Sequence, residues 1–257
     1  MHPDITITCT FTRLWAIDRW IDCLREAIHD PKKTNLVFIV DADEPHIKFL
    51  LTEYAKSRPY KKVDIIMNEN NAPSEVNIAR RRQRIAEVKN QGKPLIATTE
   101  CEYVIGLEDD TTFEPDHLMR LLDPFANNSR VGFVEGVQCG RWGVKIVGAW
   151  HVEPVIDPIK AETLPLKEEG LESITAGGFY GYATPKELYV GHDYYSGSSQ
   201  PYGPDVNYGV WLKLQGYRCF IDWSIVFGHN KHDNIIKPSG DVATIHYTKN
   251  PATGHWD

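Results

Sequence analysis

The stretch YVIGLEDDTTFEPDHL at residues 103–118 decides the prediction of the fold. Residues 103–107 form an apolar run typical of a buried strand, and three carboxylates, Glu108, Asp109 and Asp110, follow directly. In open α/β sheets, ligands bind at the carboxyl ends of strands. Adjacent carboxylates repel one another, which favours a nearby cation, and their oxygens suit Mg²⁺ or Mn²⁺. A turn in which Asp109 and Asp110 bond to backbone amides is the structural alternative.

Strand-like and helix-like patterns alternate on both sides of this stretch. Apolar, β-branched runs predict three earlier strands, and apolar residues at helical spacing predict helices between them. The strands are expected at 5–11, 36–40 and 63–67, and the helices at 17–28, at 47–54, at 74–90 with an end at Gly92, and at 118–125. Repeated βα alternation predicts an α/β fold with a mainly parallel central sheet flanked by helices.

The alternation stops after a strand predicted at residues 131–134. Residues 139–202 are rich in Gly, Pro, Trp and Tyr, and we expect short strands and long loops over one edge of the sheet. A helix beginning at Pro204 and Asp205 and stopped by Gly216 follows, and then a strand at 218–221. We expect 238–257 to be a mobile C-terminal segment. Because no repeat or linker occurs, residues 1–257 are predicted to form a single domain.

Composition narrows the classes of function. The formal net charge of −7 disfavours a surface built for nucleic acid or anionic lipid. The five cysteines are odd in number and never spaced as C-x-x-C, which favours reduced thiols and a cytoplasmic location. We see no signal peptide and no apolar run long enough to span a membrane.

Seven segments, in chain order, resemble motifs of glycosyltransferases. Residues 103–118 resemble the D-x-D segment of glycosyltransferase family 2 and its relatives with the GT-A fold, in which an acidic triplet follows a hydrophobic strand. The remaining segments are similar to the first loop (10–13), the acidic turn that binds the base (40–43), the A-R element (77–80), the acceptor-side Gly-Gly-Phe segment (177–182), the E-D helix (204–212) and the histidine that closes the metal site (227–229).

The resemblance implies different roles for the two halves of the chain. It places nucleotide-sugar binding in residues of about 1–130 and the acceptor side in about 131–237. It assigns Asp110 and His229 to a divalent metal, Mn²⁺ or Mg²⁺, Asp205 to general-base catalysis, and Gly178 and Phe179 to the acceptor side. The residues that it implies for the donor are Thr10, Arg13, Asp41, Asp43, Arg80, Glu108 and Asp109.

These roles imply a metal-dependent transfer from a nucleotide-diphosphate sugar, with a UDP-sugar expected first. A cation would stabilise the negative charge that develops on the leaving diphosphate, with Arg80 beside it. One base on the acceptor side predicts direct displacement with inversion. The neighbouring Arg81, Arg82 and Arg84 are expected to form a solvated helix face. A glycan or small-molecule acceptor is favoured, and modified DNA is disfavoured by the net charge.

Three other classes of protein compete with this interpretation. A nucleotidyltransferase of sugar phosphates needs a glycine-rich loop after its first strand, and residues 8–15 contain no glycine. A hydrolase would use the acidic triplet with His229 and His232, but the sequence lacks a compact set of His and Asp ligands. A non-catalytic sugar-binding protein would have no use for the triplet.

Overall fold

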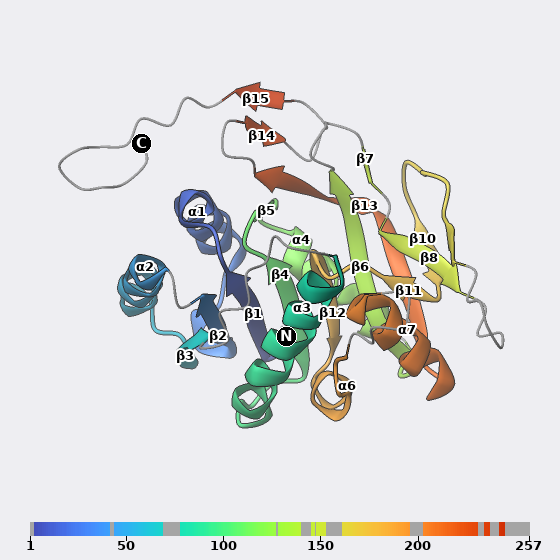
Figure 1. The fold of residues 1–257 in the computed structure, drawn as a ribbon, viewed down its shortest axis with the longest axis horizontal. Helices are drawn as coiled ribbons and strands as arrows, with labels where there is room; N and C mark the ends of the chain where they lie inside the picture. Colours follow the sequence, from blue (N-terminus) through green and yellow to red (C-terminus); the bar gives the residue numbers. More distant parts are fainter. Residues whose placement is uncertain are drawn as a thin grey trace.

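The computed structural model describes residues 3–41, 44–68, 78–126, 128–139, 145–146, 148–152, 161–195, 203–230, 234–236 and 242–244. Within these ranges, twelve strands form one sheet, whose main order is β15-β14-β13-β6-β12-β4-β1-β2-β3. Figure 1 shows this sheet with helices packed against it. Strands from both halves of the chain thus share one hydrogen-bonded sheet.

The first four long strands form the parallel part of the sheet. They are β1 (Ile5–Phe11), β2 (Thr34–Asp41), β3 (Lys62–Asn68) and β4 (Tyr103–Glu108). β1 lies between β2 and β4, and every pairing among the four is parallel. All residues of β2 are buried, as its continuous apolar run predicts for a strand covered on both faces. The predicted strands are confirmed, and their carboxyl ends meet at one edge.

Helices cover both faces of the sheet. On one face, α1 (Ile17–Ala27), α2 (Pro45–Lys56), α4 (His117–Arg120) and α5 (Asp123–Ala126) pack in one core cluster with the side chains of β1. On the other face, α3 (Ile78–Ala97), α6 (Lys186–Gly191) and α7 (Pro204–Leu214) share a second cluster and lie side by side in front of the sheet in Figure 1. Short 3-10 turns, η1 (Leu14–Ala16) and η2 (Pro31–Lys33), precede α1 and β2.

The predicted end of the third helix at Gly92 is wrong, because α3 continues through Gly92 and Pro94 to Ala97. Ile96 is fully buried in the second core cluster, and Leu95 packs against that cluster. Burial of these two side chains outweighs the local helix-breaking tendency of glycine and proline.

The region 139–202 does not lie only over an edge of the sheet, as its composition had suggested. Its strand β12 (Gly181–Pro185) is inserted into the centre, antiparallel to β4 on one side and to β6 (Val131–Cys139) on the other. All five residues of β12 are buried, with Tyr182 in one core cluster and Ala183 in the other. A strand buried on both faces shows no polar alternation, which explains why its pattern was missed.

The remaining strands extend the sheet and form a small second one. β13 (Arg218–Asn230) is much longer than the predicted 218–221 and pairs with β6, with β5 (Thr111–Thr112), with β10 (Leu171–Ile174) and with β14 (Asn234–Ile236). β7 (Lys145–Ile146) pairs with β6, while β11 (Ala176–Gly177), β8 (Ala149–Val152) and β9 (Ala161–Thr163) form the second sheet. Of the expected mobile segment 238–257, the structure describes β15 (Val242–Thr244), which pairs with β14; the rest lies outside the described residues.

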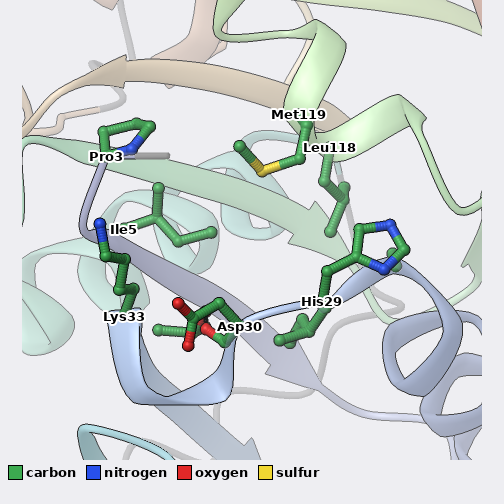
Figure 2. Close-up of a pocket in the computed structure, with 10 residues that line it drawn as sticks. Pro3, Ile5, His29, Asp30, Lys33, Leu118 and Met119 are labelled. Atoms are coloured by element: carbon green, nitrogen blue, oxygen red, sulfur yellow. Dashed lines mark hydrogen bonds between the residues drawn. The ribbon is translucent and has the colours of Figure 1, made fainter. Parts of the chain in front are cut away.

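A small pocket lies at the opposite end of the parallel strands from the acidic triplet. Figure 2 shows it between the start of β1 at Ile5, the loop after α1 at His29, η2 at Lys33 and α4 at Leu118. Its interior of about 20 Å³ suits roughly one water molecule, so it is too small for a nucleotide sugar. Among the described residues, no helix is long and apolar enough to cross a membrane.

Candidate active site

The acidic triplet lies where three parallel strands end. β4 ends at Glu108, which is in register with Thr10 near the end of β1, and β2 ends at Asp41. The indole of Trp20 in α1 donates a hydrogen bond to the Glu108 carbonyl at 3.1 Å, which fixes the end of β4. The structure therefore places the acidic triplet at the carboxyl edge of the sheet, as the sequence predicts.

Asp109 connects the triplet to the loop after β1. One carboxylate oxygen accepts hydrogen bonds from the Thr12 amide at 2.7 Å and from the Thr12 hydroxyl at 3.1 Å. The other oxygen accepts from the Arg13 guanidinium. Because Asp109 is almost completely buried and both oxygens are used in this way, its side chain holds Arg13 and the first loop against the triplet.

Asp110 and His229 are brought together by an antiparallel pairing of β5 with β13. His229 is opposite Thr111 in that pairing, and its Nε2 lies 3.2 Å from Asp110 Oδ2. Arg13 Nη1 lies 3.1 Å from the same oxygen. The other ring nitrogen of His229 lies 3.2 Å from the Gln138 side-chain amide, which orients the ring. Two residues 119 positions apart in sequence thus meet at one buried point.

The geometry of this pair fits two ligands of one divalent cation. Ligand atoms about 2.0–2.2 Å from a metal and at right angles to each other are about 3 Å apart, close to the distance between Asp110 Oδ2 and His229 Nε2. Among the described residues no group of three or more His, Cys, Asp or Glu side chains could hold a metal. Mg²⁺ and related cations are commonly held by one or two protein ligands together with substrate phosphates, so a two-residue site is chemically sufficient.

Burial raises the pKa of the carboxyls next to this pair. The pKa of Glu108 rises from 4.5 to about 7, through burial and then through the charge of Asp110. Burial also raises the pKa of Asp109 from 3.8 to about 6, against the opposing effect of Arg13. Adding positive charge to the cluster would therefore be favourable at neutral pH.

Asp205 lies on α7, which packs against α3 and β11. It lies in the first turn of α7, as predicted, but Gly203 is the residue at the N-cap position and makes no side-chain cap. Asp205 Oδ1 accepts a hydrogen bond from the Val206 amide at 2.9 Å, and burial raises the pKa of its carboxyl. Asp205 thus bonds to an amide of the first turn of α7 without occupying the N-cap position itself.

Glycines bring α7 close to the Gly-Gly-Phe segment. A Cβ at Gly209 would lie 2.6 Å from the Ala176 Cα of β11, so only glycine lets α7 pack this closely. A Cβ at Gly177 would lie 2.6 Å from the Phe133 ring and would also overlap the Glu135 carboxyl. Glu135 is fully buried below this segment, and burial raises the pKa of its carboxyl well above 4.5.

No protein-family model matches the chain, and no curated protein matches it in sequence. Solved structures do match it. A mannosyltransferase, PcManGT from Pyrobaculum calidifontis in complex with GDP-Man and Mn²⁺, has a TM-score of 0.60 at 13% identity, over 88% of this chain and 56% of that one. GalNAc-T7 with UDP, GalNAc and Mn²⁺ has a TM-score of 0.59 at 14% identity, over 90% of this chain and 43% of that one.

This chain has a GT-A fold. It spans about half the length of each of these two glycosyltransferases. A third structure, A197 from STIV, matches over nearly the whole of both chains, 96% and 95%, with a TM-score of 0.53 at 9% identity. Such identities establish the fold alone, and membership of family 2 stays a prediction.

On the donor side, one expectation from the sequence is wrong, and several others concern residues that the structure does not describe. Arg84 does not belong to a solvated helix face, because it is largely buried and pairs with Asp41 at the end of β2. Asp41 is itself buried and also accepts a hydrogen bond from Asn68 at 3.3 Å. Asp43 and the side chains of Arg80 and Arg81 lie outside the described residues, as does His232.

One charged residue of the site was missed from the sequence. Lys89 of α3 directs its ammonium towards the rings of Phe179 and Tyr182, 4.0 and 5.0 Å from their centres, and donates a hydrogen bond to the Tyr182 hydroxyl at 2.9 Å. Both Glu108 and Asp205 act on it electrostatically. The polar pattern of α3 gives no signal that separates Lys89 from the other polar residues of the helix.

Proposed function

We propose that this chain is a metal-dependent glycosyltransferase that moves a sugar from a nucleotide-diphosphate sugar to an acceptor hydroxyl. The observation that carries the proposal is the pairing of Asp110 with His229 at 3.2 Å, at the carboxyl edge of a GT-A sheet. The matched structures support it, since one is a mannosyltransferase in complex with GDP-Man and Mn²⁺ and another contains UDP, GalNAc and Mn²⁺.

On the donor side, Asp110 and His229 are proposed to hold Mn²⁺ or Mg²⁺. The cation, when bound, would neutralise charge on the diphosphate as it leaves. Arg13, anchored by Asp109, supplies a fixed positive charge beside that position. We assign Thr10 and Glu108 to the donor as well, and Asp41, Asp43 and Arg80 remain proposed donor contacts. A UDP-sugar is the first donor to test.

On the acceptor side, Asp205 is proposed as the general base and Gly178 and Phe179 as part of the acceptor wall. Asp205 takes the proton of the acceptor hydroxyl while its oxygen attacks the anomeric carbon from the face opposite the diphosphate. The carbon–oxygen bond to the diphosphate breaks, and the product has inverted configuration. We propose a glycan or small-molecule acceptor and a cytoplasmic location, which accords with the free state of Cys9, Cys23, Cys101 and Cys219.

A panel of UDP- and GDP-sugars, assayed for hydrolysis and transfer with and without Mn²⁺, tests this proposal. We expect release of nucleoside diphosphate from at least one donor, only with metal, and its loss in Asp110→Ala. Asp116→Ala is the matched control, because Asp116 is in the same segment but is exposed and pairs with the surface residue Arg120. Formation of UTP or GTP and a sugar 1-phosphate when pyrophosphate is added to a donor would indicate a nucleotidyltransferase, and metal-dependent binding of a donor without turnover would indicate a sugar-binding protein.

A further inference from the structure

Gln138 lies near the end of β6, beside the ring of His229. Its backbone is held on both sides, because Gln138 is opposite Phe227 in the parallel pairing with β13 and opposite Ile146 in the antiparallel pairing with β7. His229 follows Phe227 by two residues and so lies on the same face of β13. The side-chain nitrogen of Gln138 is 3.2 Å from His229 Nδ1. The sheet thus fixes an amide against the ring nitrogen that is not directed at Asp110.

An irregularity in the pairing of β13 with β6 brings the two side chains together. Between Asp222 and Val226, β13 advances by four residues while β6 advances by one. Without this shift, His229 would lie three residues further along β6, about 10 Å away and out of reach of the Gln138 amide. Irregularities of this kind occur preferentially next to active sites, where they redirect a side chain. The contact between Gln138 and His229 is therefore a feature that the sheet departs from regularity to make.

The hydrogen bond at Nδ1 decides which nitrogen of a neutral histidine ring has the proton. An amide nitrogen can only donate, so the arrangement in the structure leaves the ring proton on Nε2, 3.2 Å from Asp110 Oδ2. A cation needs the lone pair of Nε2 and hence the other tautomer, with the proton on Nδ1. Gln138 can support both tautomers, because a half-turn of its amide replaces the nitrogen with an oxygen that accepts from Nδ1–H.

We propose, building on the function proposed above, that Gln138 is a positioning residue whose amide switches His229 between a metal-free and a metal-binding tautomer. In the first state the amide nitrogen donates to Nδ1 while Nε2–H faces Asp110. In the second state the amide oxygen accepts from Nδ1–H while the Nε2 lone pair faces the metal position. During the change Nε2 gives its proton to water and Nδ1 takes one from water, so the charge of the ring is unchanged.

The first test compares Mn²⁺ binding by the unmodified protein, Gln138→Leu and Gln138→Glu, at about pH 8, where an ordinary histidine is neutral. Gln138→Leu, which supports neither state, should bind Mn²⁺ about 10–100-fold more weakly, the usual effect of removing the partner of a metal-binding histidine. Gln138→Glu should bind Mn²⁺ at least as tightly as the unmodified protein, because a carboxylate accepts from Nδ1–H. Gln83→Leu is the matched control, since Gln83 is exposed on α3 and donates to Glu87 instead; its Mn²⁺ affinity should be unchanged.

Stability should not follow the same order as metal affinity. Without metal, the free energy of unfolding should be lower for Gln138→Glu than for Gln138→Leu, because adding a carboxylate to an acidic site is unfavourable. A glutamine that only fills space or pairs a buried nitrogen would instead make Mn²⁺ affinity fall in step with stability. Equal weakening of Mn²⁺ binding in Gln138→Leu and Gln138→Glu would therefore refute the inference.

Nitrogen NMR of the histidine rings follows the switch in the unmodified protein, so the test does not depend on whether Gln138→Leu folds. The His229 signals are those lost in His229→Asn. The ring proton should be on Nε2 without metal and on Nδ1 with Mg²⁺. A proton on Nδ1 in both conditions would overturn the switch, even if Mn²⁺ binds. Absence of Mn²⁺ binding by the unmodified protein, with and without UDP or GDP, would overturn the metal site of the proposed function, and this inference with it.

Discussion

Gly106→Ala should destabilise the protein strongly, although it adds only one methyl group. Gly106 is in the middle of β4, opposite Tyr182 of the inserted strand β12. A Cβ at this position would lie 2.6 Å from the Tyr182 hydroxyl and would overlap the ring carbons. Carbon atoms in contact prefer a separation of about 3.5–4.0 Å, so the ring would have to move by about 1 Å.

The surroundings of Tyr182 leave no room for that movement. Its ring is fully buried and stacks on Phe133, with the ring centres 5.1 Å apart, and it packs against Phe179 at 5.0 Å. Overpacking of this kind costs about 3 kcal/mol at the upper end of its usual range. Alanine recovers about 0.5–1 kcal/mol of the backbone entropy that glycine loses in a strand. We therefore expect a net loss of about 2 kcal/mol and a melting temperature lower by about 6 °C.

Urea unfolding followed by circular dichroism measures this loss. Gly191→Ala is the matched control, since no residue that the structure describes lies within 4 Å of a Cβ there, and it should change stability by less than about 0.5 kcal/mol. The loss of unfolding free energy in the Gly106→Ala/Tyr182→Leu double variant should be smaller than the sum of the losses in the two single variants by at least about 1 kcal/mol. A Gly106→Ala protein as stable as the unmodified one would refute the central insertion of β12 against β4.

Three further predictions concern charges in and near the site. Burial raises the folded-state pKa of Glu108 to about 7, so ionising this carboxyl destabilises the folded protein; the loss of stability is absent below about pH 4.5 and is complete once the pH has risen through 7. The free energy of unfolding of Glu108→Gln, measured in urea with a chelator present, should therefore increase by about 1–2 kcal/mol relative to that of the unmodified protein between pH 5 and 8. A difference that does not change with pH would contradict this prediction. Asp205→Asn should lose about 10²–10⁴-fold in transfer with donor binding retained, and NMR should show inverted product from the unmodified protein; retention of configuration would rule out Asp205 as the base of a single displacement. Arg84→Met, which leaves Asp41 buried without its guanidinium partner, should cost about 3 kcal/mol in unfolding free energy, whereas Lys56→Met in an exposed pair should cost under about 0.5 kcal/mol; equal costs would refute the buried pairing.

The parts of the fold that could be predicted are those with a local signal. Strands β1 to β4 and helices α1 and α2 follow from runs and periodicity within about ten residues, and the site edge follows from where β4 ends. The path of α3 beyond Gly92 could not be predicted in this way, since it depends on burying Ile96 under the sheet. The same holds for β12, whose place is decided by the fit of the Tyr182 ring over Gly106.

The candidate site likewise contains residues that have a local signal in the sequence and residues that have none. The carboxylates of the triplet could be predicted as site residues, because three adjacent acids directly follow an apolar strand. Nothing in local spacing connects His229 with Asp110, and only the resemblance suggested their pairing, which in the structure follows from β5 joining β13. Lys89 and Arg84 were missed because a polar helix looks exposed on all faces until its neighbours are known. Glu135 could have been recognised as a buried acid, because it is the one charged residue in the mainly apolar strand β6.

The most direct measurement of the central claim is Mn²⁺ binding, followed by water-proton relaxation, in the presence and absence of UDP or GDP. The metal and a nucleoside diphosphate should each tighten the binding of the other, because a cation held by Asp110 and His229 would also bind the diphosphate. In Asp110→Ala the affinity for the metal should fall by more than about 100-fold, beyond the effect of losing an outer-sphere group, while the protein stays folded. Unchanged Mn²⁺ binding by Asp110→Ala, or nucleotide binding indifferent to the metal, would contradict the proposed metal site.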